Sequence, residues 1–153
     1  MKLYIIILTL VLTITGCATT SPRCELPKAS SSSNETTLVI YRPDAFYGIL
    51  YSTPFSINGC RVNDLSNDSY HVYKVPAGVH KIAAEEKAYA NGGDGVVSGT
   101  FEEGKVYYIH YSMAAGDFYS IAGAVGFTTT TQMGVVTKEY AYKVMPKLAE
   151  KKI

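Results

Sequence analysis

The chain has 153 residues, with 14 lysines and arginines against 13 aspartates and glutamates, and 47% of its residues are hydrophobic. This length suits one domain with a core of its own and argues against a second domain. The charge is nearly balanced along most of the chain, so the sequence lacks the basic footprint of a nucleic-acid-binding protein.

The N-terminal segment MKLYIIILTLVLTITGC has the pattern of a bacterial export signal. A lysine precedes an apolar run over residues 3–14, which has the length of a signal-peptide core and is too short to cross a bilayer as a helix. The run closes on ITGC, residues 14–17, which resembles the lipobox of bacterial lipoproteins. We expect residues 1–16 to be removed and Cys17 to be acylated through a thioether. The alternative is a plain secretory signal in which this cysteine is incidental.

Residues 17–36 follow as a lipidated N-terminus and a flexible tether, because they are rich in Ser, Thr and Pro and lack apolar periodicity. A flexible tether of this length reaches roughly 25 Å. If Cys17 carries lipid, Cys24 and Cys60 remain as an even pair in an oxidising compartment, where a disulfide is the expected state. The alternative keeps Cys60 as a small buried residue and Cys24 as a free or intermolecular thiol.

The domain is expected over residues 37–145 and begins with the β-branched and aromatic run TLVIYR, which stops at Pro43. Asn58-Gly59 between two short apolar runs predicts a hairpin with a type I′ turn. A second hairpin is expected across Pro76-Ala77-Gly78. The later strands of this all-β pattern are expected at 70–75, 79–86, 96–101 and 106–113.

The glycine-rich segment AAGDFYSIAGAVGF, residues 114–127, is apolar but too short to span a membrane. It could embed in a membrane surface, or form a loosely patterned strand and turn packed on the sheet. Val135-Val136 then predicts a last short strand.

A helix after Thr137 is compatible with the sequence, because Thr137 suits an N-cap and three apolar residues recur every four positions: Tyr140, Val144 and Leu148. Pro146 would end this helix near Met145, and the same residues also fit the period of a strand. Residues 146–153 form a basic tail. The late lysines indicate a solvated surface, or else a contact with anionic lipid or cell wall: Lys138, Lys143, Lys147, Lys151 and Lys152.

In their order, these segments resemble a family of small bacterial lipoproteins, those that carry domain of unknown function twenty-eight forty-six. The resemblance covers residues 37–111 and is carried, besides the lipobox and the Ser-rich tether, by LVIYRPDAFYG, FSING, YHVYKVPAGVHKIAAE and FEEGKVYYIHY. It implies a compact β-sandwich on a lipid tether, and it supplies no catalytic residue because the family has no assigned reaction. We therefore expect an all-β fold, a single small β-sandwich, transthyretin-like or similar, with a short C-terminal helix as an option. The segment 114–127 departs from the family pattern and leaves the last strands open.

His71, His80 and His110 are the only histidines, and a metal site would need them to converge. In the expected second hairpin, His71 and His80 lie on opposite faces in one register and on the same face after a slip of one residue. We expect no metal, no cofactor and no catalytic residue, since no established catalytic motif is present. Carboxylates are available at Asp44, Asp64, Asp68, Glu85, Glu86, Glu102 and Glu103.

Thirteen tyrosines and no tryptophan are the unusual feature of the composition. Such amphipathic rings suit half-buried sheet faces and also ligand or partner surfaces. In the run VYYIHYSM, strand alternation puts Tyr107, Ile109, Tyr111 and Met113 on one face, which we expect to be the core face. Tyr108 and His110 then lie on the other face, so we expect them to be more exposed and to be candidates for a contact.

These patterns favour a lipid-anchored, non-enzymatic module that binds or scaffolds an envelope protein or glycan. One alternative is a hydrolase acting on envelope glycan or lipid, which needs carboxylates or histidines to meet in one cleft. Another is a structural or exclusion lipoprotein with a protein partner. Ala18, rather than an aspartate, follows Cys17, and by resemblance to other Gram-negative lipoproteins this favours the outer membrane, with the domain facing the periplasm.

Overall fold

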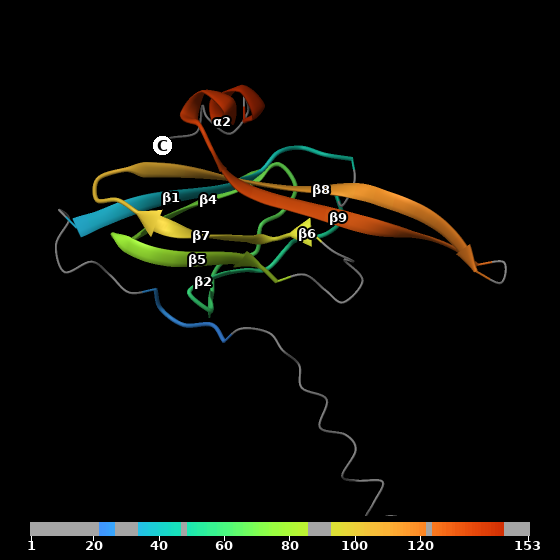
Figure 1. Ribbon diagram of the computed structural model, residues 1–153, viewed down its shortest axis with the longest axis horizontal. Coiled ribbons are helices and arrows are strands. Elements are labelled where there is room, and N and C mark those ends of the chain that lie inside the picture. Colours follow the sequence, from blue (N-terminus) through green and yellow to red (C-terminus); the bar gives the residue numbers. More distant parts are fainter. Residues whose placement is uncertain (1–21, 27–33, 47–48, 86–92, 122–123, 146–153) are drawn as a thin grey trace, which may run out of the picture.

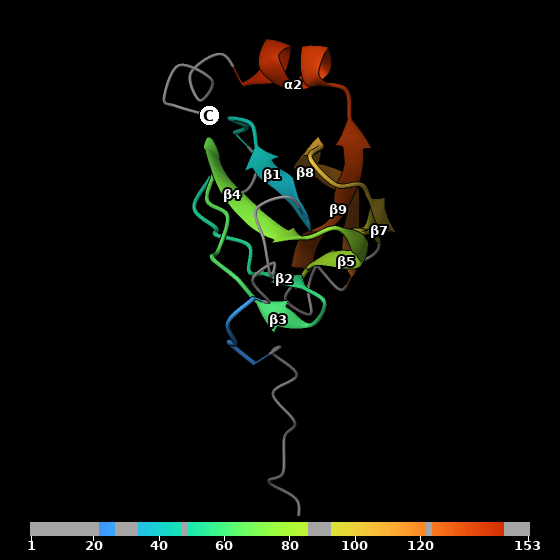
Figure 2. The same ribbon diagram turned by 90° about the vertical axis from the view of Figure 1, so that its left-hand side faces the viewer.

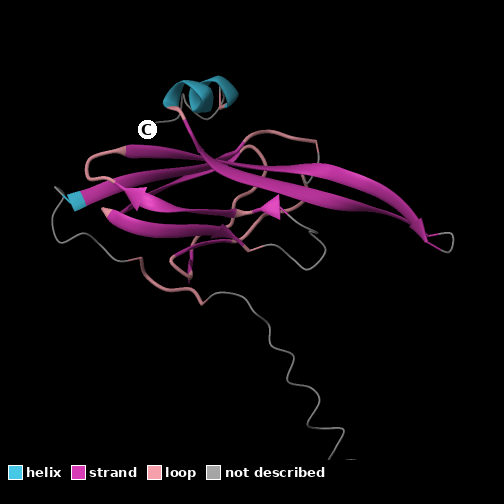
Figure 3. Ribbon diagram, viewed as in Figure 1, coloured by secondary structure: helices cyan, strands magenta, loops and turns pink. Residues whose placement is uncertain are grey.

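The computed structural model describes residues 22–26, 34–46, 49–85, 93–121 and 124–145 (Figure 1). In this part of the chain nine strands form two sheets, and helix α2 lies over the outer face of the larger sheet (Figures 1 and 2). Strands dominate the structure (Figure 3), which confirms the all-β prediction.

The larger sheet has the strand order β4-β1-β8-β9-β6. Strand β1 lies between two unlike neighbours, because it pairs antiparallel with β4 and parallel with β8. Strands β8 and β9 form a long antiparallel hairpin, and β6 pairs parallel with β9. The strands of this sheet are β1 (Glu35–Arg42), β4 (Ser69–Pro76), β6 (Gly93–Asp94), β8 (Val106–Ile121) and β9 (Ala124–Val136).

The smaller sheet has the order β3-β2-β5-β7. Asn58 and Gly59 join β2 to β3 with φ angles of 54° and 76°, as a type I′ turn requires, and Ile57 pairs with Cys60. The predicted hairpin at this turn is therefore confirmed. The strands of this sheet are β2 (Phe55–Ile57), β3 (Cys60–Arg61), β5 (Gly78–Ala84) and β7 (Val96–Phe101).

The second predicted hairpin, across Pro76-Ala77-Gly78, is wrong. Pro76 ends a strand of the larger sheet, where it pairs with Glu35, whereas Gly78 begins a strand of the smaller sheet, where it pairs with Phe101. Gly78 has a φ of 142°, a conformation that L side chains rarely adopt, and the preceding Ala77 N–H donates to the Asn34 carbonyl oxygen over 2.8 Å. The chain thus turns a corner between sheets, which lets both strands bury apolar side chains in one core.

The core lies between the two sheets. As predicted for the run 106–113, Ile109 and Tyr111 are buried there and Tyr107 and Met113 pack against it. The fully or nearly fully buried residues of this core are Leu38, Ile40, Phe55, Ile57, Leu65, Val75, Ile82, Phe101, Ile109 and Tyr111.

Helix α2 (Lys138–Val144) begins after Thr137, whose hydroxyl oxygen accepts from the Tyr140 N–H over 3.3 Å. This confirms both the helix and its N-cap, and the helix ends before Pro146 with Met145 as its C-cap. Its buried residues differ from the predicted set, because Ala141 and Met145 face the sheet while Tyr140 is 47% exposed. Leu148 lies outside the described residues.

The described residues of the glycine-rich segment, 114–121 and 124–127, belong to strands β8 and β9, whose pairing extends to Ile121 and Ala124. Val135-Val136 is therefore the end of a strand of 13 residues and not a short strand of its own. Beyond the residues paired with β1 and β6, the two strands pair only with each other among the described residues. Figure 1 shows this ribbon extending past the other strands.

Candidate functional site

The two residues predicted as a contact site, Tyr108 and His110, lie beneath helix α2. Tyr108 is only 5% exposed, and its ring packs edge-on against Tyr142 with the ring centroids 5.8 Å apart. The expected exposure of Tyr108 is therefore wrong. The reason is that α2 returns over the outer face of the sheet and forms a second core there, made of Val39, Tyr41, Tyr108, Ala141 and Met145.

His110 is half-buried in the same aromatic layer. Its ring lies 5.3 Å from the Tyr41 ring and 5.9 Å from the Tyr140 ring, measured between centroids. Burial lowers the pKa of His110, and burial raises the pKa of Tyr41 to about 12. Burial also raises the pKa of Tyr108 to about 12, with a contribution from the neighbouring Tyr142. This layer is uncharged at neutral pH and serves to hold the helix on the sheet.

The other two histidines lie elsewhere and have structural partners. His71, on β4, has Nε2 3.1 Å from the Asp64 carbonyl oxygen. His80, on β5, has Nε2 2.7 Å from the Pro76 carbonyl oxygen and Nδ1 2.8 Å from Asn58 Nδ2, which fits one tautomer with Nε2–H donating and Nδ1 accepting. The described residues contain no group of three or more His, Cys, Asp or Glu side chains arranged to hold a metal ion.

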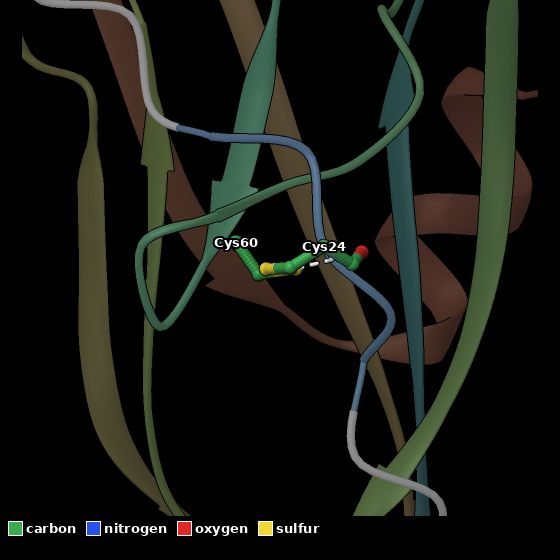
Figure 4. The surroundings of a disulfide bond; sticks show 2 residues. All are labelled: Cys24 and Cys60. Atoms are coloured by element: carbon green, nitrogen blue, oxygen red, sulfur yellow. Dashed lines mark hydrogen bonds between the residues drawn. A yellow bond between two sulfur atoms is a disulfide. The ribbon is translucent and has the colours of Figure 1, made fainter.

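Cys24 and Cys60 form a disulfide with their Cα atoms 5.4 Å apart (Figure 4), within the range such bonds require. The Arg61 N–H also donates to the Pro22 carbonyl oxygen over 3.0 Å, and Leu26 packs against the core. Residues 22–26 of the predicted tether thus lie against the smaller sheet. Cys17, the signal segment and the basic tail at 146–153 lie outside the described residues.

A cluster of exposed apolar side chains follows β1, in the connection to β2. Phe46 is 95% exposed and Leu50 is 88% exposed, with Ile49 and Tyr51 exposed by 54% and 55%. We call these four residues the apolar loop. Single exposed apolar residues are common on protein surfaces, but a cluster this large and this exposed is typical of an interaction site. These four residues were not identified from the sequence; the signal that could have found them is the run AFYGILY, residues 45–51, which lies between two prolines and is apolar throughout.

The base of the apolar loop is fixed from inside by Arg42, the last residue of β1. This side chain is 1% exposed, and its Nη1 donates to the Tyr51 carbonyl oxygen over 2.8 Å. Burial lowers the pKa of Arg42, while the nearby Tyr111 raises it. The strand thus ends in a buried cation that holds the far side of the loop by its backbone.

The side chains of Ser66 and Asn67 hold the rest of the loop base. Asn67 accepts from the Ala45 N–H over 3.1 Å and donates to the Asp44 carboxylate over 2.7 Å. The hydroxyl oxygens of Ser52 and Ser66 lie 2.8 Å apart. Because these polar contacts satisfy the ends of the loop, its apolar side chains are presented outward from a fixed base.

The apolar loop and the β8–β9 ribbon lie at the same end of the sandwich. Strands β1 and β8 run parallel, so the loop that follows β1 and the ribbon that continues β8 leave the sheet in the same direction (Figure 1). Thr53, at the end of the loop, has its hydroxyl oxygen 3.2 Å from the Tyr111 hydroxyl oxygen on β8. This contact joins the loop to the root of the ribbon.

Comparison with known proteins gives one family and no nearer relative. The family model described as Protein of unknown function (DUF2846) matches residues 32–125, which include strands β1 through β8, the start of β9 and the apolar loop. No curated protein and no solved structure matches the chain. Within the described residues, no helix has the length and apolar character needed to cross a membrane.

Proposed function

The chain belongs to the DUF2846 family of proteins of unknown function, and we propose that it is a lipid-anchored lipoprotein of the cell envelope. In this proposal its β-sandwich is a non-enzymatic module that binds or scaffolds an envelope component. Cys17 carries the lipid, and the domain faces the periplasm from the outer membrane.

The disulfide is the observation that carries the proposal. Cys24 and Cys60 are joined, so of the three cysteines Cys17 alone is left for lipid, and it stands at the end of the ITGC segment. Disulfides persist in oxidising compartments and are rare in the cytosol of mesophiles, which supports export of this chain. The export signal and the disulfide are independent features that agree on the compartment.

The contacts of the described side chains support a binding role over a catalytic one. Each histidine is engaged in a packing or backbone contact: His71 and His80 with carbonyl oxygens, and His110 with tyrosine rings. The apolar loop contains the two most exposed large apolar side chains of the described residues, Phe46 and Leu50, and these side chains suit association with an apolar partner surface.

Metabolic labelling with a palmitate analogue tests the anchor directly. The wild-type chain should be labelled and should sediment with membranes even in high salt, because several acyl chains at about 0.8 kcal/mol per buried CH₂ give effectively permanent attachment. Cys17→Ser should be unlabelled, and either released or retained as an unprocessed precursor. The double variant Cys24→Ser/Cys60→Ser is the matched control and should be labelled like the wild type.

A labelled Cys17→Ser variant, or a wild-type chain found free of membranes, would refute the anchor. Density-gradient separation of the two membranes tests the location. Co-fractionation with inner-membrane markers would refute the outer-membrane assignment and leave the anchor intact.

A further inference from the structure

We propose that strand β7 is a docking edge at which two copies of this chain pair, so that their smaller sheets join into one continuous sheet. The partner is a second copy of this chain, and the contact is antiparallel β-pairing about a two-fold axis at Ser98. The inference does not rest on the proposed anchor, because the residues that carry it all lie in the smaller sheet.

The backbone of β7 offers bonding groups along its outer edge. This strand ends the smaller sheet and pairs only with β5 among the described residues. The Gly95 carbonyl oxygen, just before β7, accepts from the Ala84 N–H over 2.7 Å and so points toward β5. In antiparallel pairing both backbone groups of a residue point to one side, and the side alternates along the strand. The N–H and C=O groups of Val96, Ser98 and Thr100 therefore point away from β5.

The other described edges are protected against pairing. Strands β3 and β6 have only 2 residues each, so neither offers a row of bonding groups. Strand β4 carries Lys74 and Pro76, two residue types that discourage pairing at an edge. The β8–β9 ribbon has a register shift between Ala115 and Phe118, and such bulges twist an edge away from partners. Strand β7 has 6 residues with neither proline nor charge, so it is the least protected of these edges.

Gly99, in the middle of β7, indicates that another backbone approaches closely. It is exposed, although it lies on the same side of the strand as the core residues Val97 and Phe101. Its φ is not positive, and a Cβ added to it would meet nothing within 4 Å. Neither conformation nor packing within the described residues therefore requires glycine here. Glycine inside a strand weakens it and often marks the close approach of a second backbone.

Two copies of β7 match each other when the pairing is centred on Ser98. Ser98 then lies opposite Ser98 of the second copy, and Val96 lies opposite Thr100, so every outward N–H and C=O finds a partner. On the other side of the strand, Val97 of one copy lies opposite Gly99 of the second, where the missing side chain leaves room for it. No charged side chain lies on either edge, so self-pairing opposes no like charges. Closed two-fold contacts of this kind are the commonest in homo-oligomers.

Crosslinking at Ser98 tests the pairing. Ser98→Cys, made in the Cys17→Ser chain, supplies the single free thiol, because Cys24 and Cys60 are bridged. A short bifunctional thiol reagent fits directly opposed residues, whose Cβ atoms lie about 5 Å apart. Val72→Cys is the matched control, since Val72 is 42% exposed on the edge strand β4 and its N–H also points away from the neighbouring strand.

We expect Ser98→Cys to give several-fold more covalent dimer than Val72→Cys at equal protein concentration. Equal yields, or no dimer in either variant, would overturn the proposal. A crosslink from Ser98→Cys to a different envelope protein, when the reaction is run in intact cells, would assign the edge to another protein's strand and overturn the pairing of two copies.

Proline at the same position tests the backbone contact. Ser98→Pro removes a donor at the centre of the edge but no bond of the β5–β7 ladder, because the Ser98 N–H points outward. The Cys17→Ser parent should sediment as a dimer, and Ser98→Pro should sediment as a monomer with an unchanged circular dichroism spectrum. A folded Ser98→Pro protein that stays dimeric, or a parent that is monomeric throughout, would refute the contact.

Ser98→Lys is the second variant and keeps the backbone N–H. In the pairing centred on Ser98 it sets two ammonium groups directly opposite each other, and like charges so placed are destabilising. Its dimer should be several-fold weaker than that of the parent at low salt and should recover in high salt, which screens the repulsion. Sedimentation that is the same for Ser98→Lys and its parent at low salt would contradict the proposed axis.

Discussion

The Nη1 atom of Arg42 donates a 2.8 Å hydrogen bond to the carbonyl oxygen of Tyr51, from a side chain that is 1% exposed. The last residue of β1 thereby ties the inter-sheet core to the apolar loop. This bond connects the stability of the sandwich with the presentation of the loop, and it gives the first of four predictions.

Arg42→Met should destabilise the fold, because it leaves the Tyr51 carbonyl oxygen without its charged donor. Hydrogen bonds to charged groups contribute about 1.5–3 kcal/mol each, so we expect a loss of that size in the free energy of unfolding. Urea denaturation of the periplasmic Cys17→Ser protein measures it. Arg23→Met, at an exposed arginine, is the control and should change stability by less than about 0.5 kcal/mol. A variant as stable as its parent would show that the bond contributes little.

Removal of the disulfide should lower stability substantially. Cys24 and Cys60 are 36 residues apart, and the chain-entropy model gives about 3–4 kcal/mol for a loop of this size. Cys24→Ser suits the measurement, since Cys24 is exposed whereas Cys60 is buried. The melting temperature of the parent, the periplasmic Cys17→Ser protein, should fall on reduction. The melting temperature of the variant that also carries Cys24→Ser should be insensitive to reductant. Two freely alkylated thiols in the non-reduced parent would contradict the bridge.

The stability of the second core under α2 should depend on Met145. This side chain is 1% exposed and belongs to the same buried cluster as Val39, Tyr41 and Tyr108. Met145→Ala leaves a cavity there and should cost about 2–5 kcal/mol in the free energy of unfolding. Lys143→Ala, on the exposed side of the same helix, should cost less than about 0.5 kcal/mol. Thermal unfolding of both variants separates the loss of buried packing, which only Met145→Ala causes, from the effect of an exposed alanine substitution in the helix. Equal effects would mean that α2 does not contribute a core.

Acid should weaken the fold through His110. Burial lowers the pKa of this histidine in the folded protein, whereas its pKa in the unfolded chain is about 6.5. The unfolded chain therefore binds the proton more readily than the folded protein does. The stability that neutral His110 contributes is complete above the pKa of the unfolded chain, and it is lost as the pH falls from there toward the pKa of the folded protein. Urea midpoints at neutral and mildly acidic pH should differ less in His110→Gln than in the parent. A difference between the two midpoints that is as large in His110→Gln as in the parent would contradict this role of His110.

Several elements could be predicted from the sequence because their causes are local. Asn58-Gly59 tolerates positive φ and so predicts the β2–β3 turn. Alternation along residues 106–113 identifies the core face of β8. The Cys24–Cys60 pair follows from counting thiols once one cysteine is assigned to lipid. Thr137 predicts its own role as an N-cap, because the cap bond reaches only three residues along the chain.

Other features depend on which distant segments meet, and only the tertiary structure decides them. Strands β4 and β5 are adjacent in sequence and both amphipathic, yet they belong to different sheets. Strand β4 pairs with β1, whereas β5 pairs with β2 and β7, and none of these partners follows directly from the local sequence. Tyr108 is on the outer face as alternation requires, but α2 covers it. The apolar loop is exposed because Arg42 and Asn67 hold its base and no described element packs over its tip. Periodicity specifies the face on which a side chain lies, whereas its burial depends on what the folded chain places above that face.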